Sequence, residues 1–169
     1  MKRVVSIDPS GNWTEGKGTT GIAFFRDGKL EDFTDVRAKD FGSPESYWNE
    51  ICVRMSLHFK KDDGADDDAI VCESFRLQPG KAAAQSWSAM ETPMLIGFLR
   101  MHTYFNACPF ILQDPSCKVR VPDHLLVQLG VLEKCNGRYY ALGRSTNDHI
   151  RDAIRHGVYY HLYGERRNE

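Results

Sequence analysis

The sequence predicts an α/β fold in which a mixed five-stranded sheet is flanked by helices. Residues 3–8 form an apolar strand pattern that ends on an aspartate, and residues 20–25 form a second one after a glycine-rich loop. Asp27-Gly28 is typical of a two-residue hairpin turn and leads into a third strand at 30–36. These segments predict an antiparallel meander of strands one to three, and we expect strands four and five to follow in parallel orientation.

Helices and strands alternate after the meander. Ser43-Pro44-Glu45 has the residues of a helix N-terminus and predicts a helix over 44–59, with apolar positions at Tyr47, Trp48, Ile51, Met55 and Leu57. The apolar run 69–72 predicts a buried strand. The other expected elements are a long helix at 81–104, a last strand at 110–112, a short helix from Pro122 to about Leu129, a turn at 135–138, and a helix from Asp148 to about His161, capped by Ser145, Thr146 or Asn147.

Length and composition favour a single globular domain over residues 1–169. At this size, and with 41% hydrophobic residues, one core buries roughly 70% of the unfolded surface. Five cysteines without a Cys-x-x-Cys pair favour a reducing compartment and argue against zinc. Acidic residues are in excess at 58–76 and basic residues at 100–144, so we expect segregated surfaces. With no recognisable leader or membrane stretch, we expect a cytoplasmic protein of a bacterium or a phage-infected host, with no membrane partner.

Two carboxylates stand at the ends of predicted strands. Asp8 ends the first strand and Glu73 ends the fourth, so the two side chains meet if these strands are parallel neighbours joined by the 44–59 helix. A strand-end aspartate is often a turn former, whereas a glutamate followed by Ser-Phe-Arg has no such role. The pair therefore favours chemistry at this edge of the sheet.

The terminal helix offers further polar groups on one face. Asp148, His149, Asp152 and His156 project within about 100° of arc, while four apolar residues occupy a different face that can pack on the sheet. Favourable interaction with the helix dipole is a sufficient alternative explanation for Asp148. We interpret His156 and His161 as surface or packing residues rather than ligands.

Clustered carboxylates repel one another unless cations neutralise them. Oxygen-rich sites of this kind suit Mg²⁺ or Mn²⁺. Two such ions about 4 Å apart can activate water and stabilise a leaving 3′ oxygen, which is the chemistry of phosphodiester hydrolysis. The carboxylates therefore predict a site for two Mg²⁺ or Mn²⁺ ions.

Three short motifs follow one another in a recognisable order. They are Ile7-Asp8-Pro9 with Gly21 downstream, Val71-Cys72-Glu73-Ser74-Phe75, and Asp148-His149-Ile150-Arg151-Asp152-Ala153. With these motifs the chain resembles the RuvC-type Holliday-junction resolvases of the RNase H-like nuclease superfamily, as a divergent, phage-type branch. The resemblance implies an RNase H-like fold and Asp8, Glu73, His149 and Asp152 as catalytic residues. The same residues are the implied metal ligands, and Asp148 is an additional candidate that could replace His149.

The resemblance implies a metal-dependent, structure-selective endonuclease that nicks Holliday junctions and other branched DNA. It also implies a homodimer, for which the 81–104 helix offers more apolar surface than one sheet face needs. Phosphate contacts require basic residues near the acids, and an aromatic residue can stack on unpaired bases. The candidates for DNA contact are Phe75, Arg76, Lys81, Lys118, Arg120, Arg151 and Arg155.

The chain departs from this family at three places. One is the basic stretch that follows the last strand in the bacterial members, which is reduced here to Lys118 and Arg120. The loop 9–19 is longer than the compact loop of the bacterial resolvases and contains Trp13 and Lys17. The family places an aromatic residue three positions after its glutamate, whereas Phe75 stands two positions after Glu73.

Other functions stay open at the level of sequence. One is a branched-DNA binding module with weak catalysis, which the mild net acidity and the altered loop would suit. Another is an RNase H-like nuclease that acts on a different nucleic acid. A fold of the actin-like class, suggested by Gly18-Thr19-Thr20-Gly21, needs a second subdomain for which 169 residues are too few. We therefore expect no nucleotide cofactor.

Overall fold

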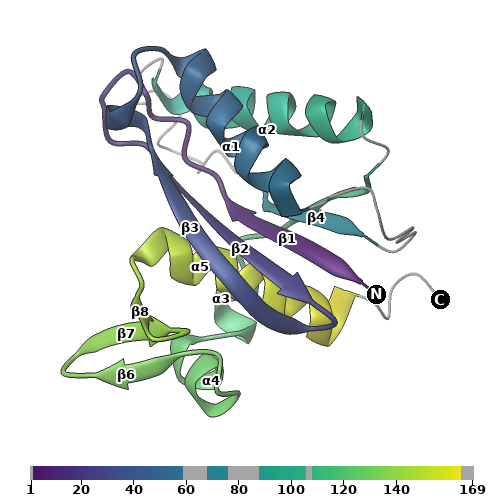
Figure 1. Cartoon of the computed structure of the whole chain (residues 1–169), viewed down its shortest axis with the longest axis vertical. Coiled ribbons are helices and arrows are strands. Elements are labelled where there is room, and N and C mark those ends of the chain that lie inside the picture. The colour runs from purple at the N-terminus through teal and green to yellow at the C-terminus, as the bar shows by residue number, and fades with distance from the viewer. Residues whose placement is uncertain (1, 59–67, 76–87, 106–107, 165–169) are drawn as a thin grey trace.

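The computed structural model describes residues 2–58, 68–75, 88–105 and 108–164. The strands of its main sheet are β1 (Arg3–Asp8), β2 (Thr19–Arg26), β3 (Lys29–Arg37), β4 (Ala69–Glu73) and β5 (Phe110–Gln113). They are arranged in the order β3-β2-β1-β4-β5, with β1, β2 and β3 antiparallel and with β4 and β5 parallel to β1 (Figure 1). The predicted mixed sheet is confirmed, and β1 lies at its centre.

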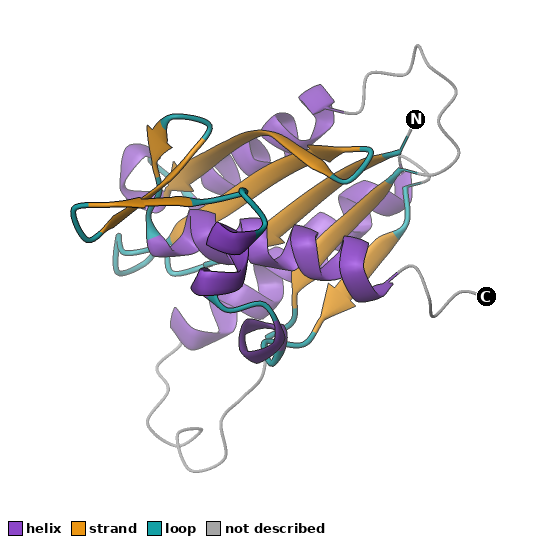
Figure 2. Cartoon of the chain, turned by 90° about the horizontal axis from the view of Figure 1, so that it is seen from below, coloured by secondary structure: helices purple, strands orange, loops and turns teal. Residues whose placement is uncertain are grey.

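Helices cover both faces of this sheet, as Figure 2 shows. Two helices, α1 (Pro44–His58) and α2 (Ser88–Phe105), lie on one face, and α5 (Asp148–Tyr159) lies on the other. The apolar residues of α5 that the sequence directs to the sheet are buried, namely Ile150, Ala153, Ile154 and Val158. None of the described helices has the length and apolar character needed to cross a membrane.

Shorter helical segments complete the fold. They are η1 (Ala38–Asp40), α3 (Cys117–Arg120), α4 (Asp123–Gln128) and a π-helical turn at Tyr160–Gly164 that continues α5. The short helix predicted from Pro122 therefore exists as α4. The Asn147 side chain accepts a hydrogen bond from the Ile150 amide and caps α5, as one of the three predicted candidates.

Two helix predictions need adjustment. The segments 59 and 81–87, which the sequence assigns to helices, lie outside the described residues, so α1 and α2 are described from Pro44 to His58 and from Ser88. Leu57 is predicted on the apolar side of α1 but is 62% exposed, and Cys52 is buried instead. The cause is the helical period, because Leu57 follows the buried Met55 by two residues and so points to the opposite side.

A second, three-stranded sheet precedes α5 and is missing from the predicted elements. It consists of β6 (Glu133–Cys135), β7 (Arg138–Ala141) and β8 (Arg144–Ser145), so the strand at 110–112 is not the last of the chain. The predicted turn at 135–138 is the β6–β7 hairpin. These strands have two to four residues and are mostly exposed, which leaves no hydrophobic alternation to detect.

The first turn of α5 lies close to the sheet at Gly21 of β2. A Cβ atom at position 21 would lie 2.1 Å from the carbonyl oxygen of His149, so a side chain is excluded there. Gly21 also pairs with Asp8 across the β1–β2 ladder. The glycine thereby lets the first turn of α5 lie beside the end of β1.

Candidate metal centre

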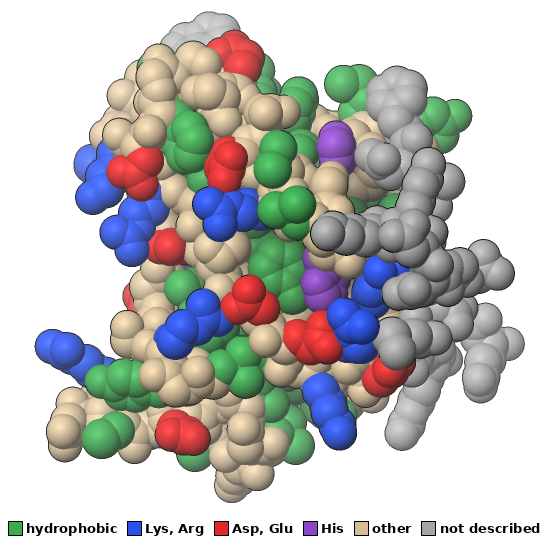
Figure 3. Space-filling model, viewed as in Figure 1, with side chains coloured by type: hydrophobic (Ala, Val, Ile, Leu, Met, Phe, Trp, Pro, Cys, Tyr) green, Lys and Arg blue, Asp and Glu red, His purple; other side chains and the backbone are tan. Residues whose placement is uncertain are grey.

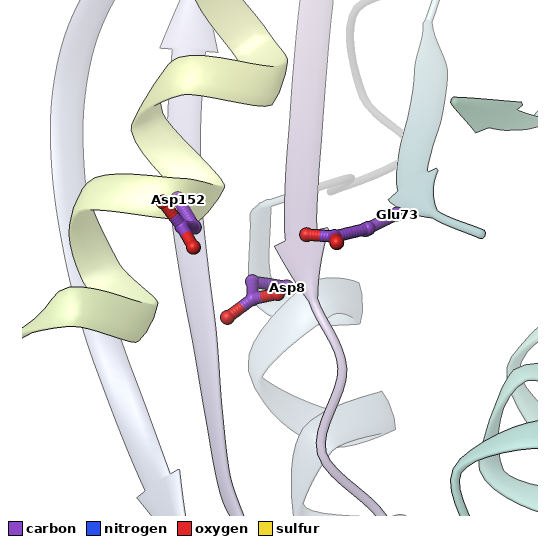
Figure 4. Close-up of side chains that lie close together, drawn as sticks. All are labelled: Asp8, Glu73 and Asp152. Carbon is purple, nitrogen blue, oxygen red and sulfur yellow. The ribbon is translucent and has the colours of Figure 1, made fainter. Parts of the chain in front are cut away.

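Three carboxylates converge at one end of the main sheet. Asp8, Glu73 and Asp152 each place an oxygen atom within 4.8 Å of the other two (Figure 4). Asp8 and Glu73 meet because β1 and β4 are parallel neighbours that both end at this edge. Asp152 joins them from α5, which packs across β1 and β2.

Asp8 is the most buried of the three carboxylates, with 8% of its surface exposed. Burial raises its pKa, a hydrogen bond from His149 opposes that rise, and the adjacent Glu73 adds to it. The His149 Nδ1 atom lies 2.7 Å from Asp8 Oδ2, and this hydrogen bond raises the pKa of His149. The contact therefore favours a positively charged imidazole next to Asp8.

Glu73 is held by a buried histidine. His156 is fully buried, its Nε2 atom donates to Glu73 Oε2 at 2.9 Å, and its Nδ1 atom lies 2.8 Å from Gln113 Oε1. Burial alone would raise the pKa of Glu73, but the hydrogen bond from His156, the contact with Asp8 and the charge of Lys118 lower it to about 2. Glu73 is thus ionised and fixed in direction.

Besides the two histidines, two basic side chains lie against the carboxylates and balance part of their negative charge. Lys118 of α3 places its Nζ atom 2.7 Å from Asp152 Oδ2 and 3.2 Å from Glu73 Oε2. Arg155 pairs with Asp152 and with Asp123, and its Nε donates to the Val121 carbonyl oxygen at 2.8 Å. The Lys118 ammonium therefore occupies a position between two carboxylates where a bound cation would also be favourable.

The donor set suits a hard divalent ion. All three converging groups offer carboxylate oxygens, the ligands that Mg²⁺ and Mn²⁺ prefer. Oxygens bound to one Mg²⁺ at about 2.1 Å can be at most about 4.2 Å apart. Small side-chain rotations of Asp8, Glu73 and Asp152 would satisfy that limit. Burial is the largest cause of the raised pKa of Asp8, and the neighbouring Glu73 carboxylate raises it further.

Of the predicted ligands, Asp148 does not join the cluster. Its side chain is 86% exposed and pairs with Arg151, one turn further along α5. Asp148 is the first residue of α5, and its side chain points to solvent although it shares a helix face with Asp152. His149 contacts Asp8 and stays the better placed of these two candidates.

The predicted DNA contacts have different surroundings. Arg76 and Lys81 lie outside the described residues. Phe75 is half-buried against the core under α1 and α2, and Arg120 is exposed. Arg155 is 7% exposed with its guanidinium engaged on several sides, which disfavours a role for it in DNA contact. The other two, Lys118 and Arg151, are bound to carboxylates.

Charged side chains of both signs are interspersed over the face drawn in Figure 3. The segregation of acidic and basic surfaces stays a prediction, because it depends on the acidic segment 58–76, which the structure describes only in part. Much of the expected acidic excess belongs to residues 59–67, outside the described part of the chain.

Sequence reasoning missed two contributors to this centre. It assigns His156 to surface or packing, and the structure shows a buried residue that also holds Glu73. It assigns Lys118 to DNA contact, whereas its Nζ lies among the acids. For His156, its position four residues after Asp152 on the same helix face is a signal that sequence reasoning could have used. For Lys118 there is no such signal, because α3 has only four residues and shows no helical periodicity.

The strand order and the carboxylates at the ends of β1 and β4 define an RNase H-like fold. Two solved structures of RuvC from Thermus thermophilus share it. One, RuvC in complex with a Holliday junction substrate, is 17% identical with a TM-score of 0.63, covering 98% of this chain and 96% of the other. The second RuvC structure is 16% identical with a TM-score of 0.60, covering 97% and 96%. No protein-family model and no curated protein matches the sequence. The chain has a RuvC-like fold.

Proposed function

We propose that this protein is a divalent-metal-dependent endonuclease that nicks four-way junctions and other branched DNA. The observation that carries the proposal is the convergence of Asp8, Glu73 and Asp152 at the end of the central strand of a RuvC-like fold. One structural neighbour with this fold was solved with a Holliday junction substrate. A partly buried site rich in carboxylates suits metal-assisted hydrolysis of a phosphodiester.

The side chains of the site have different proposed roles. Asp8, Glu73 and Asp152 would hold two Mg²⁺ or Mn²⁺ ions, with His149, in its neutral form, as a further ligand. The ions, when bound, supply the positive charge that activates water and stabilises the leaving oxygen. His156 orients Glu73, and Lys118 balances the charge of Glu73 and Asp152.

The proposal includes a homodimer formed through α2. Exposed apolar residues recur along this helix with the four–three spacing of a packing stripe, and Gly97 lies in the middle of the stripe with open space above it. Two sites related by a two-fold axis suit a substrate with two opposed strands. The stripe consists of Met90, Met94, Gly97, Met101 and Tyr104.

The proposal is tested by incubating the protein with a four-way junction in Mg²⁺ or Mn²⁺ and resolving the products on a denaturing gel. We expect paired nicks from the unmodified protein. Asp8→Asn keeps the shape of the side chain and removes its charge, so it should abolish cleavage and retain junction binding. Asp27→Asn makes the same change in an exposed hairpin turn and should cleave normally.

Three outcomes would contradict the proposed function. Cleavage that persists in Asp8→Asn would show that the hydrolytic site lies elsewhere. Tight junction binding with no nick in either metal would instead indicate a branched-DNA binding module. Cleavage of RNA–DNA hybrid or linear duplex in preference to the junction would indicate a different nucleic-acid substrate.

A further inference from the structure

A pocket of about 550 Å³ opens beside the metal centre, on the side of the loop that follows β1. Its walls come from this loop, from the end of β3 and η1, and from the first turn of α5. The lining residues that matter here are Gly16, Gly18, Thr19, Arg37, Lys39 and His149.

The pocket and the metal centre share a wall. His149 lines the pocket, and its Nδ1 atom lies 2.7 Å from Asp8 Oδ2. A polymer with one of its groups at the carboxylates would therefore reach this pocket with a neighbouring group. The pocket extends the site in one direction along the surface.

The charge of the lining favours an anion. Arg37, Lys39 and Arg151 line the pocket together with one carboxylate, that of Asp148. Arg151 pairs with Asp148 and Arg37 pairs with Asp35, which leaves the positive charge of Lys39 in excess. Within the described part of the chain, Lys39 forms no ion pair, so its ammonium is available.

Arg37 is pre-positioned at the edge of this pocket. Its Nε lies 2.9 Å from Asp35 Oδ2, and the same oxygen accepts a hydrogen bond from Asn147 Nδ2 at 2.9 Å. This link ties the end of β3 to the start of α5 and holds both walls of the pocket in place. An anion that enters would thus meet a preformed surface.

The wall of the pocket that the loop after β1 forms contains two glycines, so the backbone of a bound polymer can approach it. Gly16 and Gly18 present no side chain toward the pocket, which lets another polymer backbone approach closely. Thr19, Thr146 and Asn147 add polar side chains to the lining. Few apolar side chains contribute, so bases would gain little by entering.

We propose that this pocket binds the phosphate backbone of the DNA strand that flanks the cleaved phosphodiester, with Lys39 and Arg37 as phosphate contacts. This inference rests on the proposed function and specifies the path of its substrate. Contacts of this kind position a strand and carry no sequence information. The pocket therefore holds the strand in register with the carboxylates.

The test measures junction binding by Asp8→Asn protein, which is not expected to cleave, with Lys39→Ala or Arg37→Ala added. Binding is measured at several salt concentrations. Each lost phosphate contact should reduce the slope of log affinity against log salt by about 1, and it should weaken binding uniformly across junction sequences. Lys29→Ala is the matched control, because Lys29 is an exposed lysine at the opposite end of β3. It should leave affinity and slope unchanged. The thermal unfolding midpoint of each variant confirms that it is folded.

Two results would overturn the inference while the proposed function stands. One is an unchanged affinity and slope for both Lys39→Ala and Arg37→Ala in a protein that binds and cleaves junctions. The other is an equal loss in Lys29→Ala, which would show a general charge effect. If the unmodified protein neither binds nor cleaves branched DNA, the proposed function itself fails, and the inference fails with it.

Discussion

His156 determines the direction in which the Glu73 carboxylate points, because its buried ring is hydrogen-bonded to Glu73 and lies against Gln113. We expect His156→Ala to weaken Mn²⁺ binding by about 10- to 100-fold, as is usual when a partner of a metal ligand is removed. The free energy of unfolding should fall by roughly 2–4 kcal/mol, because a cavity and unpaired polar groups remain. Calorimetric titration with Mn²⁺ and urea unfolding measure the two effects.

A second variant separates positioning from general destabilisation. Leu126→Ala removes a fully buried side chain of α4 and should cost a similar stability. Since Leu126 is not among the groups that hold the carboxylates, Mn²⁺ affinity should be unchanged. Equal losses of Mn²⁺ affinity in both variants would show that His156 has no specific role at Glu73.

Under the proposed function, Lys118 would compete with a metal ion for the same carboxylates, since its Nζ lies near both Glu73 and Asp152. We expect Lys118→Ala to bind Mn²⁺ more tightly in the absence of DNA, by roughly tenfold, because a positive charge within 4 Å is removed. Calorimetric titration measures the change, with Lys29→Ala as the surface control. Unchanged or weaker Mn²⁺ binding would contradict the competition.

The residues of this centre differ in how well the sequence reveals them. Asp8 and Glu73 stand at the ends of apolar runs, and Asp152 has a fixed place in the helical period, so local pattern is enough to bring them together. The parts played by His156 and Lys118 depend on where α3 and β5 pack against α5. That packing is a property of distant segments, which no local pattern encodes.

Among the elements, α5 owes its position to the missing side chain at Gly21. We expect Gly21→Ala to push the first turn of α5 away from β2, because the new Cβ would collide with the His149 backbone. The unfolding free energy should fall by roughly 1–3 kcal/mol, as for an overpacked core. Junction cleavage should fall more than junction binding, since His149 and Asp152 shift relative to Asp8.

Gly42→Ala provides the control for this change. A Cβ atom at Gly42 meets no other atom within 4 Å, so stability and cleavage should stay close to those of the unmodified protein. If Gly21→Ala retained full cleavage, the close approach of α5 would be unimportant for the site. Urea unfolding and initial nicking rates of both variants distinguish the two cases.

The same difference between local pattern and distant packing decides which helices and strands can be predicted from the sequence. The five strands of the main sheet and their helices follow from hydrophobic period, an Asp-Gly turn and a Pro helix start, all of which are local. The sheet of β6, β7 and β8 is too short and too exposed for such a pattern. Its hairpin turn can be predicted because Asn136 and Gly137 both adopt positive φ, which that dipeptide favours.

For the whole molecule, the exposed stripe on α2 predicts the oligomeric state. Met94 and Met101 lie two helical turns apart on either side of Gly97, so two copies of α2 can approach closely there. Combining Met94→Glu with Met101→Glu places like charges in that contact, and unpaired buried charges are strongly unfavourable. If the proposed dimer forms through α2, we expect this double variant to sediment as a folded monomer and the unmodified protein as a dimer.

Under the proposed function, loss of the dimer should also change the pattern of nicks. A monomer still carries Asp8, Glu73 and Asp152, so it should nick a junction once, while the second nick on the opposed strand loses its coupling to the first. Leu129→Glu, at an exposed apolar position after α4, should leave both mass and paired nicking unchanged. A dimer that persists in the double variant would exclude α2 as the interface. Coupled nicks from a confirmed monomer would mean that each chain cuts both strands in turn, and the two-fold arrangement would then have no catalytic purpose.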